Sequence, residues 1–176
     1  MTLKNTFFYL LTGAALAACQ PERKPQVFNQ KGVSFAYPGD WEVDPLEEVA
    51  PGAFTLNCEK SGLNSSGLVS ISWFADSLDL DEVRGLFQQQ FATSPIYKMS
   101  DVKFAPTVAG FYGNHPARRA LYRLKMLSVP QSGSLNAFYL NGRTFMVLLQ
   151  QADEDSAAHR AGFRRIAQSL ASELPR

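Results

Sequence analysis

Residues 145–149 (Phe-Met-Val-Leu-Leu) are five consecutive apolar residues, and they constrain the fold more than any other feature of the sequence. They follow Asn141 and Gly142, a dipeptide that favours the type I′ turn of a β-hairpin. The pattern therefore predicts a strand over residues 144–150 that pairs with a strand over 135–140. Because successive side chains of a strand point to opposite faces, a continuous apolar run predicts burial on both faces. The chain is expected to form a sheet that is covered on each side.

Alternating apolar and polar residues predict further strands of this sheet. The period of two appears over residues 33–37, which end at a Pro-Gly turn, and again over 54–59 and 69–73. A turn at 63–67 separates the last two segments, so we expect them to form an antiparallel pair. Two more strands are predicted over residues 98–104 and 117–127.

Two segments have the apolar spacing of amphipathic helices. The first begins at Asp79, whose carboxylate can cap the helix with Glu82 three residues on, and it ends before Pro95. The second runs from about Glu154 to Leu174 and has acidic residues at its N-terminal end. The residues expected to face inward are Leu80, Val83, Phe87 and Phe91 in the first helix and Phe163, Ile166, Leu170 and Leu174 in the second. This order of elements predicts an α+β fold, an antiparallel sheet flanked by two helices.

The N-terminal eighteen residues are typical of a signal peptide. Lys4 precedes a largely apolar run of ten residues at 7–16, which as a helix would span only about half of a bilayer's hydrocarbon core. The run ends in Leu-Ala-Ala-Cys at 16–19, which matches a bacterial lipobox, where a signal peptidase cuts between Ala18 and Cys19 and the cysteine is diacylated. The alternative is an ordinary signal peptide followed by a coincidental cysteine.

These features predict three parts of the chain: the signal peptide at 1–18, the acylated cysteine and a tether at 19–29, and a single domain at 30–176. Two or three acyl chains on Cys19 would give a stable membrane anchor. Gln20 follows the cysteine where an aspartate would resemble an inner-membrane retention signal, so the outer membrane, facing the periplasm, is favoured over the inner membrane.

Composition excludes several classes of protein. The chain has 17 basic and 16 acidic residues, which gives no reason to expect nucleic-acid binding, and 45% hydrophobic residues, enough for an ordinary globular core. Two cysteines exclude a disulfide-rich scaffold. If Cys19 is acylated, Cys58 has no intramolecular partner, and its place on the apolar side of a strand pattern predicts a buried, inert thiol.

Charge is distributed unevenly along the chain. Residues 40–82 contain ten acidic residues and one base, whereas residues 98–143 contain seven bases and one acid. In the strand predicted over 117–127, the side chains of Arg119, Arg123 and Lys125 share one face, and we call these three residues the basic row. Same-face neighbours in a strand stand about 6.6 Å apart, so the row needs opposite charge nearby. Either the chain's own acidic region supplies it, or the row binds an acidic protein surface or lipopolysaccharide.

The sequence lacks the common catalytic and cofactor-binding motifs, so we expect no enzyme, no cofactor and no catalytic or metal-ligating residue. His159 falls on the apolar stripe of the second helix, which predicts a structural histidine. His115 lies in a turn-like segment close to Tyr112 and Arg118, and these three residues form a candidate ligand loop. A zinc or calcium ion bound there would need two or three further ligands. Asp101 and Asp153 are the candidates, and no motif supports either of them.

Three parts of the chain resemble the PsbP-like family. They are residues 31–41 (Lys-Gly-Val-Ser-Phe-Ala-Tyr-Pro-Gly-Asp-Trp), residues 113–119 (Gly-Asn-His-Pro-Ala-Arg-Arg), and the closing aromatic strand with its helix. The resemblance covers roughly residues 27–172. The family includes photosystem assembly and extrinsic subunits and bacterial envelope lipoproteins of the DcrB kind. The resemblance implies an α/β/α sandwich that binds other proteins without catalysis, and it carries no active-site residue to this chain.

Together these observations predict a non-enzymatic, membrane-anchored envelope lipoprotein that serves as an interaction, assembly or stability module. Its expected partners are the membrane, through acylated Cys19, and an envelope protein, but not nucleic acid. Two alternatives stay open. One is a lipoprotein that binds a small ligand or metal through the His115 loop, and the other is an immunity-like protein of a secretion system.

Overall fold

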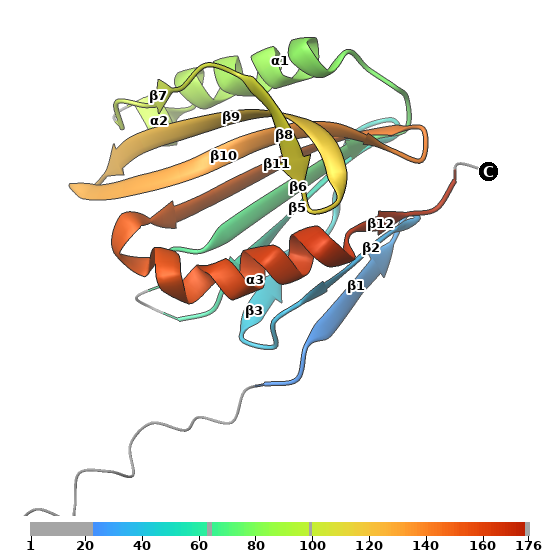
Figure 1. Cartoon of the computed structure of the whole chain (residues 1–176), viewed down its shortest axis with the longest axis horizontal. Helices are drawn as coiled ribbons and strands as arrows, with labels where there is room; N and C mark the ends of the chain where they lie inside the picture. Colours follow the sequence, from blue (N-terminus) through green and yellow to red (C-terminus); the bar gives the residue numbers. More distant parts are fainter. Residues whose placement is uncertain (1–22, 63–64, 99, 175–176) are drawn as a thin grey trace, which may run out of the picture.

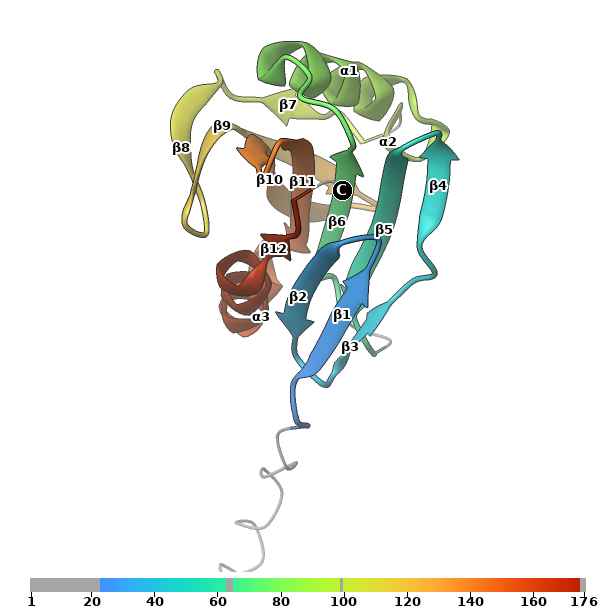
Figure 2. The same ribbon diagram turned by 90° about the vertical axis from the view of Figure 1, so that its right-hand side faces the viewer.

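The computed structural model describes residues 23–62, 65–98 and 100–174. Within them, two antiparallel sheets and two long helices are arranged in layers, with the larger sheet in the middle (Figures 1 and 2). The predicted signal peptide, its cleavage site after Ala18 and the lipidated Cys19 lie outside the described residues.

The larger sheet contains nine strands in the described part of the chain. Seven of them follow one another in the order β3 (Trp41–Val43), β5 (Ala53–Lys60), β6 (Leu68–Phe74), β11 (Arg143–Ala152), β10 (Val129–Leu140), β9 (His115–Met126) and β7 (Lys103–Phe104). The other two are β4 (Glu47–Ala50), which pairs with β5, and β8 (Val108–Tyr112), which pairs with β9. The strand that was predicted to be central, β11, lies between β6 and β10.

The apolar run of β11 is buried on both faces, as predicted. Phe145 and Val147 belong to the core on one side of the sheet, whereas Met146 and Leu148 belong to the core on the other side. The predicted turn before this strand is also confirmed, because Asn141 and Gly142 both have positive φ angles, 50° and 76°, as a type I′ turn requires.

One face of the larger sheet is covered by α1 (Leu80–Thr93). Asp79 caps this helix as predicted, since its carboxylate accepts hydrogen bonds from the backbone N–H groups of Asp81 and Glu82 at 3.0 and 2.8 Å. The helix stops before Pro95, where the short helix α2 (Pro95–Lys98) begins. The strand predicted over residues 98–104 is wrong for most of its length, because only Lys103 and Phe104 pair with β9.

The opposite face is covered by a helix and a second sheet together. A 3₁₀ turn, η1 (Asp153–Asp155), leads into α3 (Ser156–Ser169), and beside this helix lie β1 (Gln26–Gln30), β2 (Val33–Tyr37) and β12 (Ala171–Ser172). Ile166 and Leu170 share a buried core with Val33, Phe35 and Trp73. The fold is therefore α+β and mostly antiparallel. The sequence predicted that a helix alone covers this face, whereas the helix shares it with the second sheet.

Two predicted boundaries were wrong. The terminal helix ends at Ser169 instead of Leu174, because Leu170 adopts an extended backbone and the next two residues pair with β2. Leu174, predicted to face inward, is 71% exposed. The tether also ends earlier than residue 29, because β1 begins at Gln26 and pairs with β2 along its whole length.

Candidate functional site

The strand β9 divides its side chains between the two faces of the larger sheet, as predicted. Ala120, Tyr122 and Leu124 are buried on the face that α1 covers. The basic row and Leu121 alternate with them, so they point to the face on which α3 lies. Only part of that face is covered, because Arg123, Lys125 and Leu121 are exposed.

The strand register places residues of three strands in rows on this face. Leu121 lies opposite Ser134 of β10, which lies opposite Leu149 of β11. Two residues farther along the strands, a polar row is formed by Arg123, Ser132 and Gln151.

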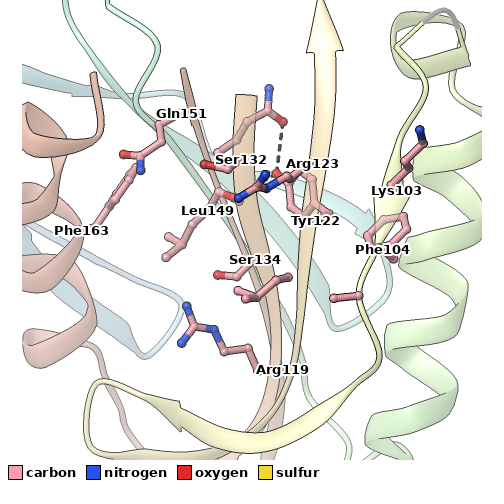
Figure 3. A pocket seen from close by; sticks show the side chains of 14 residues that line it. Lys103, Phe104, Arg119, Tyr122, Arg123, Ser132, Ser134, Leu149, Gln151 and Phe163 are labelled. Atoms are coloured by element: carbon pink, nitrogen blue, oxygen red, sulfur yellow. Dashed lines mark hydrogen bonds between the residues drawn. The ribbon is translucent and has the colours of Figure 1, made fainter. Parts of the chain in front are cut away.

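A hollow of about 580 Å³ lies over these rows, and we call it the β9–α3 groove. Phe163 of α3 lies at one side of it and Lys103 and Phe104 of β7 lie at the other (Figure 3). The side chains of Arg119 and Arg123 extend from β9 toward α3. The residues that line the groove are Lys103, Phe104, Ala105, Arg119, Leu121, Tyr122, Arg123, Ser132, Gly133, Ser134, Leu149, Gln150, Gln151 and Phe163. A cavity of this size lies within the range of ordinary ligand sites.

Small residues of β10 create the hollow. Ser132, Gly133 and Ser134 replace the bulky side chains that a buried strand usually carries. Gly133 is required by its neighbours, because a Cβ there would collide with the carbonyl oxygen of Leu149 and the phenol of Tyr122. The Tyr122 hydroxyl donates a hydrogen bond of 2.9 Å to that carbonyl, so the floor of the groove is fixed by the sheet itself.

The groove is positively charged. Its lining includes Lys103, Arg119 and Arg123, and none of the described residues that line it is acidic. Within the described chain, no carboxylate lies within 4 Å of any cation of the basic row. Among the described cations that line the groove, only Lys103 has an acidic partner, Asp101 at 3.0 Å, and both of those side chains are mostly exposed.

Of the two sources of opposite charge that the sequence left open, the chain's own acidic region forms no ion pair with the basic row among the described residues. Asp40 lies 3.9 Å from Lys60, near the opposite edge of the sheet. Asp81 approaches Arg84 at 3.6 Å and Arg118 at 3.4 Å, on the side of α1. Asp40 and Asp81 therefore pair with bases away from the basic row, whereas Asp101 pairs with Lys103 at the groove.

Two polar atoms of the groove are buried without a hydrogen-bond partner among the described residues. They are Nε of Arg119, a donor, and Oε1 of Gln151, an acceptor. A buried polar atom that stays unpaired costs about 1–3 kcal/mol.

The structure does not bring the three residues of the candidate ligand loop together, although the turn is exposed at Gly113, Asn114 and Pro116. Tyr112 is buried and its ring stacks on Phe138, with 5.4 Å between ring centroids, and burial raises the pKa of its phenol. His115 stacks on Phe138 at the same distance. Arg118 lies on the opposite face of the sheet, where it approaches Asp81. The three side chains do not converge on one ligand.

The β8–β9 turn instead packs on α3. Gly113 has a positive φ angle of 57°, and a Cβ at this position would collide with the backbone carbonyl of Ala167. Nε2 of His115 lies 3.4 Å from the carbonyl oxygen of Leu170. Across the described ranges, no three side chains of His, Cys, Asp or Glu are grouped so that they could hold one metal ion.

The remaining histidine and cysteine are structural, as predicted. His159 is buried between Trp41 and Phe163, with its Nε2 3.5 Å from the Ser65 hydroxyl. No described residue partners its Nδ1, so no carboxylate orients this ring. Cys58 is fully buried, and burial raises the pKa of its thiol to about 12, which keeps the thiol protonated at neutral pH.

Sequence reasoning identified Arg119 and Arg123, but it missed Lys103 and the floor of the groove, and Lys125 is not among the described lining residues. Ser132, Ser134 and Gln151 were not singled out, although the run Ser-Gly-Ser inside a strand pattern carried a signal, because glycine in a strand often marks a close approach of another group.

No protein-family profile matches this chain, and no curated protein sequence matches it significantly. Its fold is similar to several solved structures. The solution structure of cyanobacterial PsbP (CyanoP) from Synechocystis sp. PCC 6803 superposes with a TM-score of 0.59 at 14% identity, covering 90% of this chain and 99% of that one. A protein from Bacteroides thetaiotaomicron gives a TM-score of 0.53 at 14% identity and covers 87% of this chain and 49% of that one.

A third structure, LpqN, involved in cell envelope biogenesis of Mycobacterium tuberculosis, gives a TM-score of 0.48 at 13% identity, covering 84% of this chain and 90% of that one. The likeness to CyanoP shows that the domain has a PsbP-like fold. Among the helices of the described ranges, none has the length and apolar character needed to cross a membrane.

Proposed function

We propose that this protein is a non-enzymatic, lipid-anchored binding domain of the bacterial cell envelope, which holds an acidic partner protein through the basic row. The observation that carries the proposal is the β9–α3 groove, a preformed hollow that is lined by cations and by no described acid. Single-sign charge at a concave surface steers and selects a partner of opposite charge.

The proposed anchor is Cys19, after cleavage behind Ala18, and Gln20 favours the outer membrane over the inner membrane. Arg23, four residues after this cysteine, already lies against Gly39 of the domain. Four extended residues span about 14 Å, so the domain would stay close to the lipid surface. The residues that follow pack against the domain, because a Cβ at Gly39 would collide with the backbone carbonyl of Lys24.

The placement of Cys58 and of the two histidines supports a binding role over a catalytic one. Cys58 is fully buried and its thiol has a pKa of about 12. His115 and His159 pack against aromatic rings, and neither lines the β9–α3 groove. The cations of the groove are suited to binding an anion, and they lack the carboxylate or imidazole base that general acid-base catalysis needs there.

The anchor is tested by Cys19→Ser. We expect the variant to accumulate as an uncleaved precursor that takes up no palmitate analogue, whereas Cys58→Ser is labelled normally. Equal labelling of the Cys19→Ser variant and the unchanged protein would contradict the lipoprotein proposal.

The binding role is tested by in-cell crosslinking of the full chain followed by mass spectrometry. The test variant reverses the basic row (Arg119→Glu, Arg123→Glu and Lys125→Glu). The matched control makes the same change in charge at Arg160, Arg164 and Arg165, three exposed residues of α3. We expect a specific partner that is retained in the control and lost in the test variant. A partner kept equally by both variants, or none with the unchanged protein, would overturn the proposal.

A further inference from the structure

The two arginines of the β9–α3 groove are separated by a fixed distance. Arg119 and Arg123 are four residues apart on one strand, so their Cα atoms stand about 13 Å apart and their side chains point to the same face. Leu121 lies between them on that face and is 49% exposed. The groove therefore presents a cation, an apolar residue and a second cation at the period of an extended chain.

The centre of the groove is apolar between its charged ends. Leu121 and Leu149 flank the small residue Ser134, and Phe163 borders the hollow from α3. An apolar side chain placed here would be removed from water, while the arginines on either side would bind anionic groups.

The two separate cations of the groove favour a peptide as its occupant. Arg119 and Arg123 have no carboxylate within 4 Å among the described residues, and an extended peptide can bring one anionic side chain to each of them. A simple anionic amphiphile has one charged end, so it could neutralise only one of the two arginines.

We infer that the β9–α3 groove binds an extended acidic segment of a partner protein, in which two acidic residues four positions apart flank an apolar residue at the middle position. An extended segment repeats its side-chain direction every two residues, so these three side chains point the same way with the spacing of Arg119, Leu121 and Arg123. This inference rests on the proposed function, because it specifies what the basic row recognises.

Two labelled peptides of identical composition test the spacing by fluorescence anisotropy, with the full chain purified in non-ionic detergent. The first peptide has glutamate at its first and fifth positions and leucine at its third. The second carries the same residues with the two glutamates adjacent. We expect the first peptide to bind about tenfold more tightly, which corresponds to about 1.4 kcal/mol. Equal binding of the two peptides would overturn the inferred spacing.

Single variants locate the binding peptide. Arg119→Gln and Arg123→Gln should each weaken binding of the first peptide by about tenfold, as expected for loss of a charge-assisted hydrogen bond. The matched control is Arg118→Gln, which removes the same side chain from the opposite face of the same strand. If Arg118→Gln weakens binding as much as the other two substitutions, the peptide does not lie in the groove.

The outcomes separate this inference from the proposed function. If crosslinking finds a partner that needs the basic row but both peptides bind equally, the spacing is wrong and the binding role stands. If neither experiment detects binding, both are wrong. Dodecyl phosphate tests the alternative of an anionic lipid. If it displaces the first peptide and binds more tightly than either peptide, the occupant is an anionic lipid.

Discussion

The end of α3 gives the sharpest test of the packing that borders the groove. Leu170 follows the helix and is 4% exposed in the core beneath it, whereas Leu174 is 71% exposed, although the sequence pattern placed both on one apolar stripe. Replacing Leu170 by alanine removes three carbon groups at about 0.8 kcal/mol each, and incomplete collapse of the cavity raises the loss of unfolding free energy to about 3 kcal/mol.

This loss is measurable by urea unfolding that is followed through tryptophan fluorescence, since Trp41 and Trp73 are both buried. In a domain of this size each 1 kcal/mol lowers the melting temperature by about 2–4 °C, so Leu170→Ala should lower it by roughly 6–12 °C. The matched variant Leu174→Ala should change the unfolding free energy by less than about 0.5 kcal/mol. Similar losses in both variants would mean that the helix continues and that β12 does not form.

Two further predictions concern buried titratable groups. Burial lowers the pKa of His159, Lys60 lowers it further, and Asp155 and Asp40 oppose the shift. The imidazole of the unfolded chain then binds a proton more tightly than that of the folded protein, so the free energy of unfolding should fall as pH drops below about 6.5. We expect the urea midpoint to fall between pH 7 and pH 5, and His159→Phe should reduce this fall. A variant with an unchanged pH dependence would refute this assignment. Because Cys58 is fully buried and its pKa is raised to about 12, iodoacetamide at pH 8 should label it only through unfolded molecules. Rapid labelling of the native protein would show that the thiol is accessible.

Local patterns predicted the elements whose structure depends on nearby residues. The burial of β11 on both faces followed from its continuous apolar run, and the start of α1 followed from the cap at Asp79. The alternation of β9 was also predictable, because the period of two alone separates Arg119 from Ala120. In each case the signal lies within a few residues of the element that it describes.

The small sheet and the groove depend on pairings between distant residues, which is why the sequence did not reveal them. Ala171 lies in a stretch with helical spacing, but pairing with Ser34 of β2 extends its backbone. The polar row of the groove joins Arg123, Ser132 and Gln151, and its existence depends on the register of three strands. A shift of one residue in that register would turn these side chains to the other face.

The layers of the fold explain why this part of the sheet is open. The twelve residues of β9 and of β10 extend about 40 Å, whereas the fourteen residues of α3 extend about 21 Å. The small sheet lies on the same face but packs with β5, β6 and α3, away from β9 (Figure 2). The face of β9 and β10 therefore remains partly uncovered and must carry polar residues.

The need to keep this face hydrated does not explain why its charged residues are all basic. An exposed sheet face is kept soluble equally well by charges of both signs, and charges of mixed sign would stabilise one another. Of the cations in the described lining of the groove, Arg119 and Arg123 have no carboxylate within 4 Å and Lys103 pairs with Asp101, whereas Asp40 and Asp81 pair with bases elsewhere. Repulsion between the two arginines is small in physiological salt, because their separation of about 13 Å exceeds the Debye length of about 8 Å. An acidic partner would gain instead from two cations that no described carboxylate already pairs, and this is the physical reason to look for the partner at the groove.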